Sequence, residues 1–120
     1  MKKMYIAVLD EVPDFMVPTL VAHSVINAHM YFADIDKLCT DEFDVYQDWL
    51  ENSFKKVVLR VNRKEFEKIS ELPVWLGHEN TTLNAEKSCA VVLPMDDADR
   101  PNVLIYAKMW KPTYDNNGSV

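Results

Sequence analysis

The sequence predicts an α/β domain in which a mixed, four-stranded sheet lies between helices in three layers. Short apolar runs rich in β-branched residues recur along the chain, as expected of strands buried on both faces. Segments with helical apolar spacing alternate with these runs, as expected of helices that cover a sheet. The 120 residues suit one domain, which we expect over 1–112, followed by a disordered tail at 113–120.

Strands and helices are expected to alternate from the start of the chain. The expected strands are 4–9, 57–61, 74–76 and 89–93, and the expected helices are 18–33, 41–54 and 63–72. This order implies a mostly parallel or mixed sheet with helices on both faces. Residues 101–110 allow a short helix followed by an extended segment.

The N-terminal half holds the first strand and two helices. The apolar run 4–9 is too short for a helix and stops at Asp10. Pro18 suits the first turn of the helix 18–33, because the N–H that proline lacks has no helical partner there. Asp41 carries a side chain that can cap the second helix.

In the second half, turn and cap residues set the boundaries. The run 57–61 is apolar and β-branched apart from one arginine, which favours a strand. Asn62 is a good N-cap for the next helix, and Pro73 ends that helix. Polar residues then fill 77–88, and an acidic turn fills 96–100.

The composition restricts the class of partner. The formal net charge of −6 weighs against nucleic acid, because domains that bind it usually carry a basic face. Basic residues nonetheless gather in 55–68, which is either a solvated face or a contact for an anionic backbone. Cys39 and Cys89 lie in no metal-ligand spacing, so we expect reduced thiols and no metal. No apolar stretch approaches the roughly 20 residues of a membrane span, and we expect a cytoplasmic protein.

His23 is the first candidate for chemistry. Thr19 and Asn27 lie one helical turn before and after it, so the three form a polar stripe on an otherwise apolar helix. One interpretation is a general acid or base beside a cleft. The other is a partly buried histidine whose hydrogen bonds are satisfied by its neighbours.

The polar run Gly77-His78-Glu79-Asn80-Thr81-Thr82 is the second candidate. It follows a predicted strand, and ligands of open α/β sheets bind beyond strand ends. The run offers a carboxylate, an imidazole, an amide and two hydroxyls. A plain surface loop has the same composition, so this alternative also stays open.

Taken together, the order of elements and several segments resemble the archaeal and eukaryotic, or second, type of peptidyl-tRNA hydrolase. That family carries a Gln-Cys-Ala-His-Ala motif on its first helix, where this chain has Leu20-Val21-Ala22-His23-Ser24. Its second strand reads Lys-Val-Val-Leu-Lys-Val, where this chain has Lys56-Val57-Val58-Leu59-Arg60-Val61. The resemblance extends over nearly the whole chain, in short motifs.

The resemblance implies hydrolysis, without a cofactor, of the ester that joins a peptide to tRNA, often by a homodimer. The motif histidine corresponds to His23 and the loop threonine to Thr81. The family lysine before the helix falls at Met16, and the loop aspartate falls at Gly77. Glu79, two residues further on, is the nearest carboxylate that could replace it.

Two functions therefore follow from the sequence. As a hydrolase, the chain would use His23, Glu79 and Thr81 in catalysis. Its candidate substrate-binding residues are Met16, Thr19, Asn27, Asn80, Arg60 and Lys64. The alternative is a non-catalytic binding or regulatory protein for a peptide or small ligand. It is favoured by the missing lysine and aspartate, because a positioned acid or base contributes about 10²–10⁴ in rate.

Overall fold

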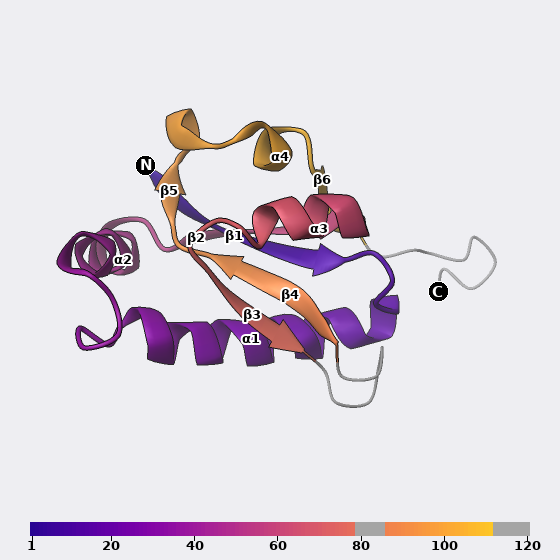
Figure 1. Cartoon of the computed structure of the whole chain (residues 1–120), viewed down its shortest axis with the longest axis horizontal. Coiled ribbons are helices and arrows are strands. Elements are labelled where there is room, and N and C mark those ends of the chain that lie inside the picture. The colour runs from indigo at the N-terminus through magenta and orange to yellow at the C-terminus, as the bar shows by residue number, and fades with distance from the viewer. Residues whose placement is uncertain (79–85, 112–120) are drawn as a thin grey trace.

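The computed structural model describes residues 1–78 and 86–111 and shows four α-helices around a mixed sheet of six strands (Figure 1). The strands are β1 (Lys2–Leu9), β2 (Lys55–Val61), β3 (Val74–His78), β4 (Lys87–Val92), β5 (Met95–Asp96) and β6 (Lys108–Met109). The helices are α1 (Val17–Phe32), α2 (Thr40–Asn52), α3 (Arg63–Ile69) and α4 (Asn102–Ile105), with 3₁₀ turns at η1 (Asp14–Met16) and η3 (Asp97–Asp99). The predicted α/β class with a mixed sheet is confirmed.

The prediction of four strands is wrong, because the sheet has six. Each of the additional strands, β5 and β6, has two residues, which is too short to produce an apolar run in the sequence. β5 pairs with the start of β1, where Lys3 lies opposite Met95. β6 pairs with β2, where Leu59 lies opposite Met109. The tail predicted at 113–120 lies outside the described residues.

β1 occupies the middle of the sheet, in the order β3-β4-β1-β2-β6. It runs parallel to β2 and antiparallel to β4 and β5. A parallel pair needs a crossover, which α1 and α2 supply between β1 and β2. With neighbours on both edges and helices on both faces, β1 is fully buried from Met4 to Leu9. This burial explains why its sequence is a continuous apolar run.

The side chains of β1 alternate between the two faces of the sheet, and their contacts indicate which elements lie on each face. On one face, the ammonium of Lys2 donates to Asp48 of α2 at 2.6 Å. On the other, the hydroxyl of Tyr5 donates to Asp97 of η3 at 2.9 Å. Because successive strand residues point to opposite faces, α1 and α2 cover one face, and α3 and α4 cover the other (Figure 1). The layers are therefore helix, sheet and helix.

Helix starts illustrate where local sequence rules hold. The cap predicted at Asp41 is wrong, because Cys39 occupies the N-cap of α2 and Asp41 lies in its first turn. There its negative charge still interacts favourably with the positive end of the helix dipole. α3 starts as predicted, since Asn62 Oδ1 accepts from the Glu65 N–H at 2.8 Å and the Glu65 carboxylate accepts from the Asn62 N–H at 2.9 Å.

Within the described residues, none of the helices is long and apolar enough to cross a lipid bilayer.

Candidate functional site

His23 lies on the solvent-facing side of α1, with its side chain exposed. Its Nε2 is 3.2 Å from Asn27 Nδ2, and the same amide donates to the His23 carbonyl at 3.1 Å. Thr19, one turn earlier, is exposed as well. The structure therefore keeps the predicted polar stripe together, but the hydrogen-bond partner it shows for the imidazole is an amide and not a carboxylate. Glu79, Asn80 and Thr81 lie outside the described residues.

Gly77, which the resemblance predicts to stand at the aspartate position of the hydrolase family, is packed tightly against α1. A Cβ at Gly77 would lie 2.3 Å from Ser24 Oγ and 2.8 Å from Trp75 Cζ3. Ser24 is itself fully buried, so a Cβ at Gly77 could be accommodated only by a shift of closely packed atoms. The close approach of β3 and α1 thus requires glycine at this position, and an aspartate side chain does not fit there.

Met16, which the resemblance predicts to stand at the lysine position of the hydrolase family, is the N-cap of α1. It is partly buried and packs against the core. A thioether carries no charge and is a weak hydrogen-bond acceptor. This position therefore contributes apolar packing and no cation.

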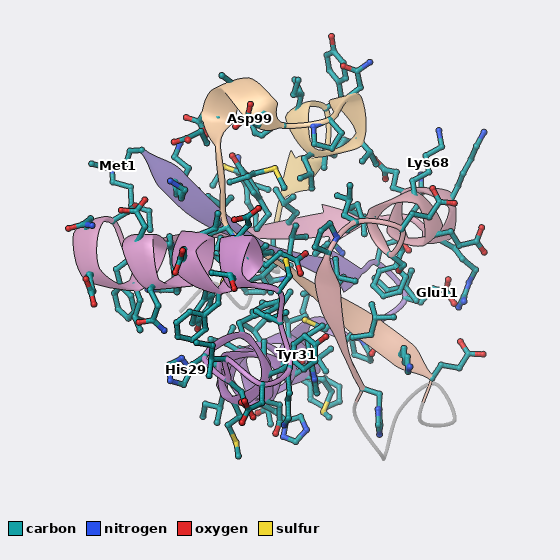
Figure 2. All side chains as sticks on the ribbon, turned by 60° about the vertical axis from the view of Figure 1, so that its left-hand side comes forward. Met1, Glu11, His29, Tyr31, Lys68 and Asp99 are labelled. Atoms are coloured by element: carbon teal, nitrogen blue, oxygen red, sulfur yellow. The ribbon has the colours of Figure 1, made fainter. Side chains whose placement is uncertain are left out.

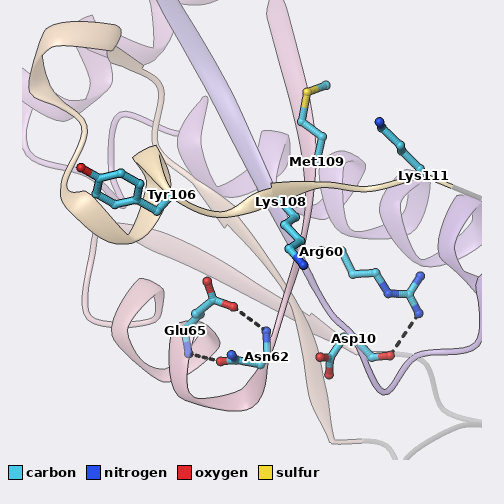
Figure 3. A pocket seen from close by; sticks show the side chains of 8 residues that line it. All are labelled: Asp10, Arg60, Asn62, Glu65, Tyr106, Lys108, Met109 and Lys111. Carbon is cyan, nitrogen blue, oxygen red and sulfur yellow. Dashed lines mark hydrogen bonds between the residues drawn. The ribbon is translucent and has the colours of Figure 1, made fainter.

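A concave surface lined mainly by polar residues lies elsewhere, beyond the carboxyl ends of the parallel strands β1 and β2. We call it the strand-end cleft; it has a volume of about 510 Å³ (Figure 3). Its lining residues are Asp10, Arg60, Asn62, Glu65, Tyr106, Lys108, Met109 and Lys111. Asp10 directly follows β1 and Asn62 directly follows β2, where ligands of open α/β sheets bind.

Arg60 forms one wall of the strand-end cleft but is held by its own chain. Its guanidinium pairs with the carboxylate of Asp14 and donates to the carbonyls of Asp10 at 3.0 Å and Val12 at 3.2 Å. These bonds tie the segment that enters α1 to β2. The structure therefore gives this predicted substrate-binding residue a role in positioning that segment.

Charges of both signs line the cleft, and apart from Arg60 none of them forms an ion pair with another described residue. Lys108 points from β6 toward the side of the cleft on which Asp10 and Glu65 lie (Figure 3). Lys111 is the second residue after the end of β6. The Glu65 carboxylate is already engaged in the cap of α3, so Asp10 and the two lysines are the charges left to meet a ligand.

Lys64 is exposed on α3 and lines a second groove of about 720 Å³ between α3 and α4. The two hollows share Asn62, Glu65 and Tyr106. The ring of Tyr106 is 79% exposed and stands between them. Of the predicted binding residues, Arg60 and Lys64 thus lie near one connected surface. Thr19 and Asn27 lie on α1, and Met16 precedes it at the N-cap.

Neither cysteine forms a metal centre in the described part of the chain, which holds no group of three His, Cys, Asp or Glu able to bind a metal ion. Cys39 is exposed and Cys89 is buried in β4. Burial raises the pKa of the Cys89 thiol to about 12, so it stays protonated and unreactive at neutral pH.

No known protein family model matches the chain, and no curated protein matches it.

Proposed function

We propose that the chain is a non-catalytic binding protein, and that it binds a peptide segment or a small zwitterionic molecule in the strand-end cleft. The observation that carries this proposal is that one cleft at a strand end is lined by the Asp10 carboxylate and by the ammonium groups of Lys108 and Lys111, none of which forms an ion pair with another described residue. Its volume of about 510 Å³ suits a ligand of a few residues.

The chemistry of the cleft supports that class of ligand. A peptide or zwitterion brings an ammonium group for Asp10 and a carboxylate for Lys108. Exposed apolar surface from Tyr106 and Met109 can cover a side chain of the ligand. With carboxylates also at the rim, the cleft is less suited to a polyanion such as a nucleic-acid backbone, which needs a continuous basic surface.

The absence of two catalytic groups of the hydrolase family, the lysine and the aspartate, supports a non-catalytic role. Gly77 leaves no space for an aspartate beside Ser24, and Met16 supplies no cation. Each missing catalytic group costs about 10²–10⁴ in rate, so the loss of two removes most of a hydrolase's activity.

Hydrolysis of the peptidyl-tRNA ester is the second candidate, favoured by one observation. The His23 imidazole is accessible, and the next residue, Ser24, touches Gly77 near the end of β3. The histidine turn therefore lies beside the strand that leads toward Glu79 and Thr81. This candidate requires a carboxylate or hydroxyl to complete the site.

A thermal-shift screen tests the binding proposal. The purified chain is scanned with a dipeptide library of varied charge, with nucleotides and with tRNA. A dipeptide present at 100 times its dissociation constant should stabilise the fold by about 2.7 kcal/mol. Asp10→Asn and Lys108→Gln should remove most of this shift, because each deletes one of the complementary charges.

The matched control is Lys87→Gln, an exposed lysine on β4 outside the cleft, which should leave the shift unchanged. No shift with any dipeptide, or shifts that survive both cleft variants, would remove this proposal. A shift with tRNA that weakens as salt rises would favour the hydrolase instead.

A further inference from the structure

An apolar groove of about 400 Å³ lies between α1, α2 and the start of β2. Its aromatic lining residues are Tyr46 and Trp49 from α2 and Phe54 from the segment before β2, and we call it the aromatic groove. Figure 2 shows His29 on the flank of α1 next to α2, where its Nδ1 shares a 2.8 Å hydrogen bond with the hydroxyl of Tyr46. That bond engages the polar group of Tyr46, so its ring lines the groove with apolar surface.

Phe54 adopts a backbone conformation that phenylalanine rarely takes. Its φ of 63° lies in the left-handed region, directly after the C-cap Ser53 of α2, where glycine is usual. Burial does not account for an aromatic residue at this position, since 56% of its surface is exposed. Its ring instead lies beside that of Trp49, with the two centroids 5.3 Å apart. Residues held in such conformations are concentrated at functional sites, so Phe54 indicates a role for the groove.

Lys56 supplies a charge to the aromatic groove. Among the described residues that line the groove, it is the only Asp, Glu, Lys or Arg. Its ammonium donates to the Phe54 carbonyl at 2.6 Å and lies 3.3 Å from the centroid of the Phe54 ring. An ammonium has three N–H donors, and none of the carboxylates that the structure describes forms an ion pair with this one. The groove thus joins an apolar lining to a cation that can accept an anionic partner.

We propose that the aromatic groove binds a small amphipathic carboxylate, whose apolar body contacts the aromatic rings and whose carboxylate pairs with Lys56. A volume of about 400 Å³ suits a small molecule, and such sites are mostly apolar with a few placed polar groups. A carboxylate adds an ion pair that a neutral ligand of the same shape lacks, whereas an amine is repelled. The described lining residues differ from those of the strand-end cleft, so this is a second site.

The surroundings of the aromatic groove favour a small molecule over an extended apolar partner or a lipid surface. By helical spacing, the polar stripe of α1 lies on the side of the helix next to Ile26, which bounds the apolar lining there. On α2, the exposed residues Glu51 and Asn52 directly follow Leu50 of the groove. A broad partner would have to desolvate these polar groups, whereas a ligand held within the groove leaves them in water.

Three naphthalene derivatives with the same ring and different charge test the proposal in NMR titrations of the whole chain. Naphthylacetate should bind with a dissociation constant below about 1 mM, a modest affinity for a ligand of this size. It should bind at least about threefold more tightly than naphthylacetamide, as expected of one partly exposed ion pair. Naphthylethylamine, which carries a positive charge, should bind most weakly.

Two variants separate the contribution of the charge from that of the ring. Lys56→Gln should abolish the preference for the acetate over the amide, because it removes the cation and keeps the groove. Phe54→Gly should weaken naphthylacetate binding at least about threefold while the urea midpoint stays the same or rises, since glycine adopts a φ of 63° without strain. A purely structural role for Phe54 would instead lower the urea midpoint.

Lys55→Gln is the matched control, because it makes the same change in net charge at the exposed neighbouring residue, on the opposite face of β2. It should leave all three affinities unchanged. Lys108→Gln in the strand-end cleft should do so too, so the two sites succeed or fail separately. The proposal would be overturned by equal affinities for acetate and amide or by loss of binding in Lys108→Gln. It would also be overturned if naphthylacetate at about 10 mM, ten times the expected limit, produced no binding.

Discussion

Replacement of Gly77 by aspartate is expected to lower the free energy of unfolding by about 3 kcal/mol and to confer no hydrolase activity. The new Cβ would lie 2.3 Å from Ser24 Oγ, and Ser24 is fully buried where α1 packs against β3. To accommodate the aspartate side chain, either α1 must move away from the sheet or β3 must lose its register with β4. The carboxylate would also be placed at a buried position, which adds a desolvation cost.

Urea unfolding of a short series separates the steric effect from the charge. Gly77→Ala should cost less than the aspartate, and Ser24→Ala should recover part of that cost, since it removes the nearer of the clashing atoms. His78→Ala, at the exposed end of the same strand, should change stability by less than about 0.5 kcal/mol. If the effects of Ser24→Ala and Gly77→Ala on the free energy of unfolding were strictly additive, a steric clash between the side chains at 24 and 77 would be contradicted.

Replacement of Arg60 by methionine is expected to cost about 2 kcal/mol of stability. The change removes the guanidinium from the carboxylate of Asp14 and from the carbonyls of Asp10 and Val12. Both partners of the ion pair are more than two-thirds buried, so water replaces these bonds poorly. Arg60→Lys should recover only part of the loss, because an ammonium cannot form the same fork of hydrogen bonds.

Arg63 provides the matched control for Arg60. Its guanidinium binds Glu11 at 2.8 Å and Glu86 at 3.2 Å, but all three side chains are about half exposed. Arg63→Met should therefore change the urea midpoint far less than Arg60→Met, as exposed ion pairs contribute little. Equal losses for the two arginines would contradict the role assigned to Arg60 in holding the segment before α1.

The regular elements of this fold could be predicted because each carries a strong local signal. The apolar run of β1, the helical spacing of α1 and the capping residue Asn62 all lead to the observed structure. β5 and β6 have no such signal, since two-residue strands exist only through pairing with β1 and β2. Their positions depend on tertiary contacts that no local pattern contains.

The candidate site was harder to predict for a related reason. The sequence pointed to His23 and the polar run 77–82, whereas the strand-end cleft depends on Tyr106, Lys108 and Lys111. These residues belong to a stretch with no clear periodicity. The signal that could have identified the cleft was Asp10, a polar residue directly after the end of a parallel strand.

Single-turnover hydrolysis of a peptidyl-tRNA ester tests the central claim most directly. The wild-type chain and His23→Ala are compared at high protein concentration with a blank that lacks protein. We expect both proteins to release peptide no faster than the blank, because an accessible imidazole without a cation at 16 or a carboxylate at 77 lacks its catalytic partners. Clear wild-type turnover that His23→Ala abolishes would contradict the account and identify the chain as a hydrolase.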